Sequence, residues 1–192
     1  MNFCSNCGAA IQRCIPKDDD RPRFVCDVCH TVHYQNPKTV VGCIPECGGR
    51  ILLCRRAIEP RAGYWTLPAG YLENGESVTE AARREVLEET RSRVEVRDLY
   101  TVFTLLHWNQ IYMIFRAALL DQDFGPTRES SEVGLFDLLD IPWGELAFET
   151  ISETLRHYVS DRAEGFFFLR VGTIPANRPP RRTAVHSIGG TI

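Results

Sequence analysis

The sequence predicts an α/β protein in which a small cysteine-rich module precedes one larger domain of strands and helices. Three features support this prediction: two C-x2-C pairs near the N-terminus, several runs rich in β-branched and aromatic residues, and a capped helical segment. The chain has 192 residues, which suffices for one ordinary domain and a small module. We therefore expect a module at residues 1–36, a domain at residues 37–175, and a disordered Pro- and Arg-rich tail at residues 176–192.

Composition and charge exclude several classes of protein. With 44% hydrophobic and 24% charged residues, the chain has the composition of a soluble globular protein. Its formal net charge of −3 argues against non-specific nucleic-acid binding, which requires a basic surface. No apolar run reaches the roughly 18 residues of a membrane span, and the N-terminus lacks the basic and apolar regions of a signal peptide. We expect a cytoplasmic protein without a membrane or nucleic-acid partner.

Residues 1–36 are predicted to form a zinc ribbon. Four of the eight cysteines form two C-x2-C pairs, which are Cys4, Cys7, Cys26 and Cys29. Two such pairs supply four thiolates for a structural Zn²⁺, and a segment this small needs a metal to be stable. A disulfide pair and a thioredoxin-like redox motif are the alternatives, although the βαβ setting of the redox motif is absent. His30 and His33 are expected at the surface.

The larger domain is predicted to begin with a β-hairpin. The runs at residues 39–46 and 51–56 are strand-like, and the Gly-Gly pair between them is a hairpin signal. Arg55 and Arg56 close the second strand. One of the two is a candidate ligand for a substrate phosphate, and a surface arginine pair is the alternative.

A helix is predicted to begin at Val78 and to continue to Thr90. Ser77 and Glu80 form an S-x-x-E capping box, and no Gly or Pro interrupts the segment that follows. At about 100° per residue, three glutamates share one arc of this helix: Glu85, Glu88 and Glu89. An adjoining apolar stripe, able to pack on a sheet, consists of Val78, Ala82 and Val86.

The three glutamates admit two interpretations. Like charges three or four residues apart destabilise a helix by roughly a few tenths of a kcal/mol per pair. Hard cations such as Mg²⁺ or Mn²⁺, which prefer carboxylate oxygens, would remove this cost. The alternative is a solvated acidic face with salt bridges to Arg83 and Arg84. Composition alone does not decide between the two.

Seven positions between residues 70 and 89 have a recognisable spacing, namely Gly70, Glu76, Arg84, Glu85, Val86, Glu88 and Glu89. This pattern, G-x5-E-x7-R-E-aliphatic-x-E-E, resembles the box of the Nudix family, whose members hydrolyse a nucleoside diphosphate linked to another moiety. The resemblance implies an α/β/α sandwich with a mixed sheet and with this helix beneath the active site. It implies that the box glutamates and the Ala69 carbonyl hold divalent ions. It further implies a salt bridge between Glu76 and Arg84 that fixes the loop onto the helix.

The chain departs from the family pattern at the end of the box. The family has a glycine followed by an aliphatic residue where this chain has Arg91 and Ser92. A glycine there would suit a left-handed helix cap, and a residue with a side chain pays about 1–2 kcal/mol for that conformation. We therefore predict that the helix end is rebuilt, while the metal ligands upstream of it are kept.

Two further strands are predicted at residues 94–106 and 110–120, which are rich in β-branched and aromatic residues. A hairpin or bend joins them. His107 and Trp108 in this bend are candidates for lining a base-binding pocket, with core or surface placement as the alternative for each.

The C-terminal part of the domain is predicted to supply one more acidic residue and a second helix. The family resemblance implies that a loop carboxylate completes the metal site or activates water, with Glu129 as first choice and Glu132 as second, against solvated loop carboxylates. A helix region is predicted to start at Pro142. Its buried stripe consists of Phe148, Ile151, Leu155 and Tyr158. Residues 165–174 are predicted to form a last strand or an extended arm.

Five motifs together resemble one group within the family, the plant chloroplast FAD pyrophosphatase and its bacterial relatives. They are FCxxCG, YQNPKxVVGC, LLCRRAI, GYWTLPAGYLENGES and ESxEVxLF, and they extend from Phe3 to about Thr173. The resemblance implies hydrolysis of FAD to FMN and AMP. ADP-ribose is the main alternative, because both substrates present ADP joined through a second phosphate. NADH is a weaker alternative substrate, since the S-Q-P-W-P-F-P-x-S motif of the NADH pyrophosphatases is absent after the box.

Two other classes of function remain open. A Nudix module could sense a nucleotide without cleaving it, although the intact REVLEE run argues against this. A zinc-ribbon adaptor for RNA or protein is disfavoured by the low net charge and the lack of a basic aromatic stripe. The expected partner is a small dinucleotide-type substrate, and we expect a homodimer that forms through the ribbon or its adjoining strands.

Overall fold

The structure is a computed structural model, and it describes residues 1–175. The tail predicted at residues 176–192 lies outside the described residues. The chain divides into two compact units, Met1–Pro37 and a larger unit that begins at Lys38. Within the described part, no helix combines the length and the apolar character needed to cross a membrane.

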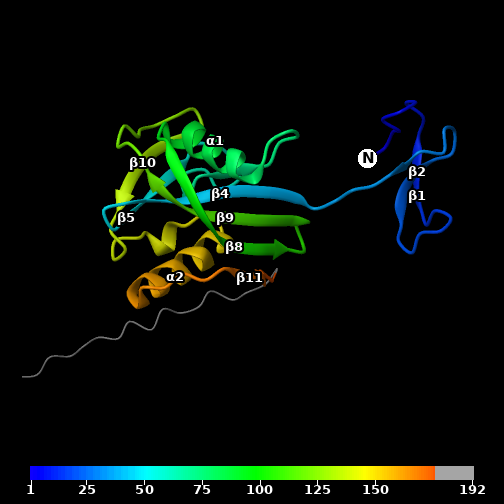
Figure 1. Cartoon of the computed structure of the whole chain (residues 1–192). Coiled ribbons are helices and arrows are strands. Elements are labelled where there is room, and N and C mark those ends of the chain that lie inside the picture. The colour runs from blue at the N-terminus through cyan, green and yellow to red at the C-terminus, as the bar shows by residue number, and fades with distance from the viewer. Residues whose placement is uncertain (176–192) are drawn as a thin grey trace, which may run out of the picture. The chain divides into compact units, whose positions relative to one another are not determined.

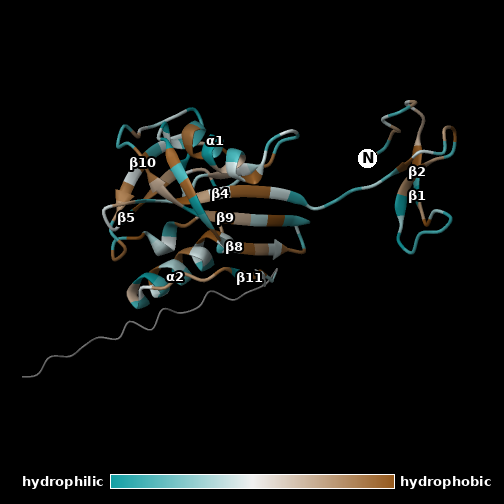
Figure 2. Ribbon diagram, viewed as in Figure 1, coloured by the Kyte–Doolittle hydropathy of each residue, from teal (hydrophilic) through white to brown (hydrophobic). Residues whose placement is uncertain are grey.

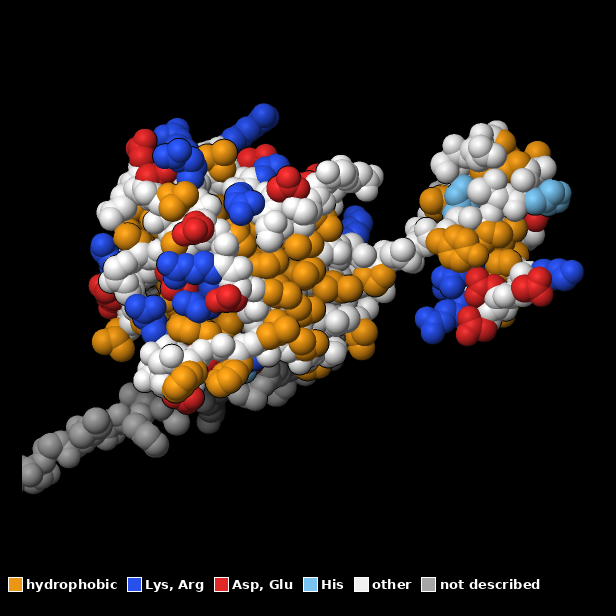
Figure 3. Space-filling view, in the orientation of Figure 1, with side chains coloured by type: hydrophobic (Ala, Val, Ile, Leu, Met, Phe, Trp, Pro, Cys, Tyr) orange, Lys and Arg blue, Asp and Glu red, His pale blue; other side chains and the backbone are white. Residues whose placement is uncertain are grey.

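The amino-terminal unit is a three-stranded antiparallel sheet (Figure 1). Its strands are β1 (Ile11–Cys14), β2 (Arg23–Cys26) and β3 (Val32–His33), in the order β1-β2-β3. Several apolar side chains of this unit are exposed, and hydrophobic atoms cover much of its visible face (Figure 3). They include Phe3, Ile15, Val28 and Tyr34. A unit that leaves its apolar residues outside has little core, so its stability must come from another source.

The larger unit is built on an eight-stranded mixed sheet. Its main path is β10-β5-β4-β9-β8-β11, while β6 pairs with β5 and β7 with β4. The strands are β4 (Lys38–Cys47), β5 (Arg50–Arg56), β6 (Trp65–Thr66), β7 (Ala69–Tyr71), β8 (Val94–Leu105), β9 (Gln110–Leu119), β10 (Ser130–Phe136) and β11 (Arg170–Thr173). The pairs β4–β9 and β8–β11 are parallel and the others antiparallel, which confirms the predicted mixed sheet. The last segment is therefore a strand and not a free arm.

The predicted hairpin between β4 and β5 is confirmed. Gly48 and Gly49 form its turn with φ values of +56° and +88°. Two-residue hairpin turns favour positive φ at both central positions, which glycine adopts without steric cost.

Two helices cover opposite faces of the sheet, α1 (Val78–Thr90) and α2 (Glu149–Glu164) (Figure 1). Side chains alternate along β4, so Cys43 packs with α1 while Ile44 packs with α2. The middle of β4 is accordingly apolar over a continuous stretch (Figure 2). Strands buried on both faces have this pattern. The predicted α/β/α sandwich is confirmed.

The predicted helix start at Pro142 is wrong. A short 3-10 helix, η1 (Trp143–Glu145), comes first, and α2 begins at Glu149. The intervening backbone is extended because it pairs with β6, where Ala147 N donates to Trp65 O at 2.8 Å. The predicted buried stripe is present further along, with Ile151, Leu155 and Tyr158 in the core and Phe148 packed against it.

The predicted rebuilding at the end of α1 is also wrong. Arg91 adopts the left-handed conformation itself, with φ of +67°, and its N–H donates to Leu87 O at 2.9 Å. The helix thus keeps the cap that a glycine would provide. Retaining this cap satisfies a terminal carbonyl, which offsets part of the steric cost of placing a side chain there.

Replacing Arg91 by glycine should therefore stabilise the protein. Arg91→Gly removes the steric cost of the left-handed conformation, about 1 kcal/mol, although glycine gains freedom in the unfolded chain. A gain of this size corresponds to a rise of roughly 2–4 °C in Tm for a domain of this length. Thermal melting of the variant beside Arg91→Ala checks this, because alanine retains a Cβ and should give no gain. A lower Tm for the glycine variant would contradict the steric argument.

Candidate active site

A pocket of about 810 Å³ lies in the larger unit, at the place where α1, β7, β9 and the start of α2 meet. The box glutamates Glu85, Glu88 and Glu89 line it together with Glu129. Aromatic and apolar residues line other parts, including Leu105, Tyr112, Phe148 and Ile151. One cavity therefore combines a dense group of carboxylates with apolar surface.

Two of the box glutamates are buried. Glu85 and Glu89 are 7% and 6% exposed, whereas Glu88 is exposed. Burial raises the pKa of Glu89 to about 7 and raises the pKa of Glu85 as well, because desolvation disfavours the charged form. The Ala69 N–H donates to Glu89 Oε2 at 3.0 Å, and Cys54 Sγ lies 3.6 Å from the same oxygen. Glu89 is thus held in one orientation by its surroundings.

Strand β7 approaches α1 so closely at Gly70 that any larger residue there would displace the Glu85 carboxylate. A Cβ on Gly70 would overlap the Glu85 carboxylate. The neighbouring residue, Ala69, lines the pocket as well, so β7 brings its backbone polar groups to the carboxylates. The glycine of the box is explained by this contact rather than by a turn.

Arg84 connects the loop to the helix. Its Nη2 and Nε donate to Glu76 at 2.6 and 3.0 Å, and its Nη2 donates to Tyr71 O at 3.0 Å. Its Nη1 donates to Glu85 at 2.6 Å and to Glu88 at 3.2 Å. The arginine lowers the pKa of Glu76 to about 2 through these hydrogen bonds. One side chain therefore positions the loop and orients two box glutamates.

The structure separates the two carboxylates that were predicted in a loop, because Glu129 precedes β10 whereas Glu132 lies within this strand. Glu129 lines the pocket, and its carbonyl accepts from Ala57 N at 2.8 Å, which ties the loop to the end of β5. Glu132 is absent from the pocket lining and instead pairs with Arg55, with 3.3 Å between Oε2 and Nη1. Only Glu129 is placed to act on a molecule bound at the box.

The two arginines of β5 are separated in the same way, because neighbouring side chains of a strand point to opposite faces. Arg56 lines the pocket, its Nε donates to Pro60 O at 2.8 Å, and its guanidinium lies 5.4 Å from the ring centroid of Phe148. Arg55 donates to Gly63 O at 2.7 Å and lies outside the pocket lining. Arg56 is the phosphate candidate that the geometry supports.

Several lining residues were not assigned to a site from the sequence. They are Leu105, Tyr112, Ala147, Thr150, Ile174 and, as a site residue, Phe148. His107 and Trp108 line the rim of the pocket, and Trp108 is 67% exposed. No local signal marks the newly assigned residues, because β8, β9 and α2 come together only in the folded chain.

The chemistry of the carboxylate group fits a hard divalent cation. Three helix carboxylates and the Ala69 backbone meet at one pocket, and two of these carboxylates are desolvated beside each other. A cation bound there would stabilise their charged forms. Carboxylate and carbonyl oxygens are the ligands that Mg²⁺ and Mn²⁺ prefer.

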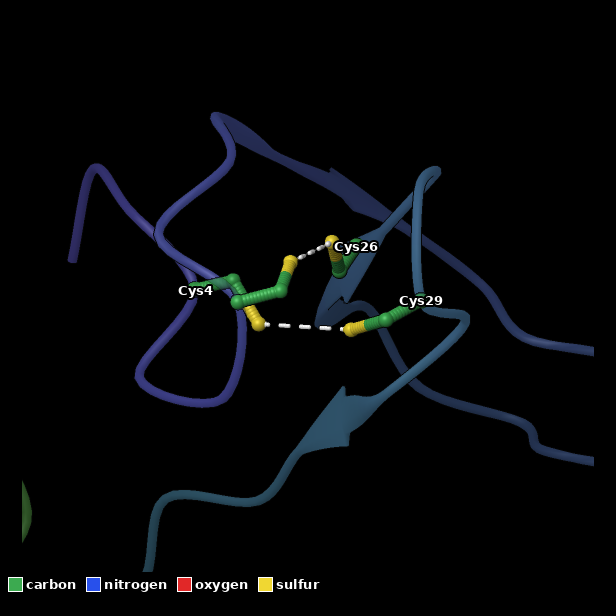
Figure 4. A group of neighbouring side chains, drawn as sticks. Cys4, Cys26 and Cys29 are labelled. Carbon is green, nitrogen blue, oxygen red and sulfur yellow. Dashed lines mark hydrogen bonds between the residues drawn. The ribbon is translucent and has the colours of Figure 1, made fainter.

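The amino-terminal unit has a second potential metal site. The Sγ atoms of Cys4, Cys7, Cys26 and Cys29 all lie within 4.8 Å of one another. Figure 4 shows the thiols of the two C-x2-C pairs turned toward each other. The Sγ atoms of Cys4 and Cys29 are 3.6 Å apart, and those of Cys7 and Cys26 are 3.5 Å apart. Tetrahedral Zn²⁺ with bonds of about 2.3 Å requires sulfur–sulfur distances of about 3.8 Å. The four thiols are therefore already close to the spacing that Zn²⁺ needs.

The surroundings of these thiols distinguish between the alternatives. All eight cysteines are free, so the disulfide interpretation is not supported. His33 is not a simple surface residue, because its Nε2 lies 3.3 Å from Cys4 Sγ. Hydrogen bonds from Thr31, followed by one from Asn6, lower the pKa of the Cys29 thiol to about 5. Thiolates are the form that binds metal.

Comparison with known proteins assigns both units. Residues 36–157 match the NUDIX domain family, and residues 2–35 match the family described as Nudix N-terminal, a zinc ribbon. The crystal structure of a NUDIX hydrolase from Nitrosomonas europaea is 51% identical, with a TM-score of 0.88 over 91% of this chain and 99% of that chain.

Curated relatives carry more specific names. The ADP-ribose pyrophosphatase of Methanocaldococcus jannaschii is 32% identical over 60% of this chain and 70% of the relative. The NAD-capped RNA hydrolase NudC of Photobacterium profundum is 28% identical over 77% of this chain, but only 51% of the relative is covered. The chain thus spans about half the length of that relative. Since the NUDIX domain match covers more than half of the chain, this protein belongs to the Nudix hydrolase family.

Proposed function

We propose that this protein hydrolyses the pyrophosphate bond of an ADP-containing dinucleotide-type substrate. The observation that carries the proposal is the single pocket in which Glu85, Glu88, Glu89 and Glu129 lie with Arg56. A pyrophosphate is anionic, so a purely acidic pocket would repel it. Divalent cations on the glutamates and the Arg56 guanidinium would supply the opposite charge.

In this proposal the box glutamates and the Ala69 carbonyl hold Mg²⁺ or Mn²⁺. Such ions neutralise phosphate charge, orient the pyrophosphate and make water more acidic when they are bound. The protein contributes rigid ligands. Ala69 N–H and Cys54 fix Glu89, and Arg84 fixes Glu85. Ligands that are already in position need no reordering when substrate binds.

Glu129 is the proposed general base. It lines the pocket from a loop that is separate from the box helix, and it faces the charge of Glu85. It would take a proton from water while the water oxygen bonds to one phosphorus and the bond from that phosphorus to the bridging oxygen breaks. Two phosphate monoesters result. Arg56 would bind the non-bridging oxygens, because guanidinium groups match phosphate geometry.

Three kinds of substrate are candidates. The motif resemblance to the FAD pyrophosphatase group favours FAD, which would yield FMN and AMP. The M. jannaschii relative is named for ADP-ribose and the NudC relatives for NAD-capped RNA, which favours ADP-ribose or an NAD-type molecule. All three hypotheses share a nucleotide joined through a second phosphate. A cytoplasmic location and a homodimer stay predictions from the sequence.

A substrate panel tests the proposal. With Mg²⁺, the protein should release mononucleotide from FAD or ADP-ribose much faster than from dinucleoside polyphosphates or CoA. Initial rates over a concentration series give kcat/KM for each compound, including NADH. A preference for NADH would show that the FAD assignment is wrong. Binding without cleavage of any compound would favour the nucleotide-sensing alternative.

Removing one carboxylate charge at the box should abolish most activity. Glu89→Gln and Glu85→Gln should each lower kcat by about 10²–10⁴, the range typical for loss of a charged catalytic group. Glu129→Gln should cause a similar loss. The measurement is kcat at saturating Mg²⁺, accompanied by melting curves.

Glu132→Gln is the matched control for these variants. It changes the same functional group outside the pocket and should keep kcat within a few-fold of the wild type, because Glu132 pairs with Arg55. If Glu85→Gln and Glu89→Gln also turned over within a few-fold of the wild type, the acidic face would be merely solvated and the proposed function would fall.

We further propose that the cysteine site holds a structural Zn²⁺. Cys4→Ser should lower Tm and solubility, because the ribbon has little core of its own. Turnover per folded molecule should stay within a few-fold of the wild type. Cys14→Ser, which alters a ribbon cysteine outside the four-thiol group, should leave Tm unchanged. Metal analysis of fresh protein should find about one Zn per chain, and a value far below this would contradict the proposal.

A further inference from the structure

The part of the pocket wall that α2 forms contains an unsatisfied polar group. Thr150 lies in the first turn of α2, lines the pocket and is 1% exposed. Its Oγ1 has no hydrogen-bond partner among residues 1–175. Most buried hydroxyl groups in folded proteins are paired, so an unpaired one at a pocket wall calls for an explanation.

The backbone around Thr150 adds further donors. The N-cap of this 16-residue helix is Phe148, whose side chain makes no capping hydrogen bond. The first N–H groups of a helix have no partner within the helix, so without a side-chain cap they stay available to a ligand. The same end of the helix therefore has an unpaired hydroxyl beside the N–H groups of Glu149 and Thr150, whereas the Ile151 N–H already donates to Phe148 O at 3.1 Å.

Apart from the neighbouring Glu149, the pocket wall around these groups is apolar. Leu105, Ala147, Ile151 and Ile174 line the same pocket and are each less than 9% exposed. A phosphate placed among them would lose its hydration with few charges to replace it. A neutral planar heterocycle fits better, because apolar walls with a few placed polar groups are typical of such sites.

Arg56 marks the boundary between the two kinds of surface. Its charge acts on Glu89 on one side, and its guanidinium lies over the ring of Phe148 on the other. Phosphate oxygens would bind on the Glu89 side of this arginine. The remainder of the substrate would then meet Phe148 and the start of α2.

We propose that the wall formed by Leu105, Ala147, Thr150 and Ile151 binds the nucleobase of the substrate, and that Thr150 Oγ1 and the N–H groups of Glu149 and Thr150 orient the edge of the base. This inference rests on the proposed function, because it assigns the half of the substrate that the glutamates do not hold.

The rim of the pocket is the other place for a base. The rings of Trp108 and His107 lie near each other there, with 5.6 Å between ring centroids and a tilt of 56° between their planes. However, Trp108 is 67% exposed, and the nearby Gln110 already donates to the Tyr71 hydroxyl at 3.0 Å. The rim offers a stacking surface but little burial and no unpaired buried group. The α2 wall is therefore favoured.

Calorimetric binding of AMP and ribose 5-phosphate to the full chain in Mg²⁺ tests the proposal. Thr150→Val removes the hydroxyl and keeps the shape of the side chain. It should weaken AMP binding by about five- to tenfold, the effect of one neutral hydrogen bond. Ribose 5-phosphate lacks the base, so its binding should stay within about twofold. Thr150→Ser keeps a hydroxyl and should bind AMP like the wild type.

Melting curves show whether Thr150→Val still folds, and its Tm should equal or exceed that of the wild type, because an unpaired buried hydroxyl is removed. Equal loss of both ligands, or unchanged AMP binding, would overturn the proposal. So would a selective loss of AMP binding in Trp108→Ala instead. Binding is measured without turnover. A protein that cleaved no test substrate would therefore refute the proposed function, while the binding data would still test the base site.

Discussion

The close contact between Gly70 of strand β7 and Glu85 of helix α1 is the constraint on which the site depends. It buries the Glu85 and Glu89 carboxylates against backbone, and a Cβ at position 70 would already overlap one of them. Strand β7 also lies close to β4, because a Cβ on Gly42 of β4 would overlap Ala69 of β7. Helix α1, strand β7 and the central strand β4 are therefore closely packed at the site, which restricts the movement of the two carboxylates.

This arrangement is costly in the absence of a cation. Desolvation raises the pKa of both buried carboxylates, and the nearby Glu85 charge adds to the effect on Glu89, whose pKa reaches about 7. The folded protein then binds protons more tightly than the unfolded chain, so ionising Glu89 as the pH rises toward 7 removes stability. A cation bound to the charged carboxylates would restore this stability. The strain is tolerated because α1 packs its apolar side on the sheet through Ala82 and Val86.

Local patterns predicted from sequence were the ones that held in the fold. The start of α1 follows from the Ser77–Glu80 capping box, and both of its hydrogen bonds are present. Two features decided by the folded chain were mispredicted, namely the start of α2 and the cap that follows α1. Pairing with β6 keeps the chain extended up to α2, and Arg91 keeps the left-handed cap, with its N–H bonded to Leu87 O, although its own preference disfavours that conformation. In the pocket, likewise, the glutamates of one helix were predictable, whereas Thr150 was not.

This difference has a physical basis that also explains why the box defines a reaction class and not a substrate. The three box glutamates come from one short continuous segment, so the sequence alone predicts that they lie close together. The apolar wall comes from β8, β9 and the start of α2, whose residues meet only after the sheet has formed. Residues such as Leu105 and Thr150 can change without disturbing the contact between Gly70 and Glu85. The apolar wall can therefore vary in sequence while the carboxylate group of the box is kept.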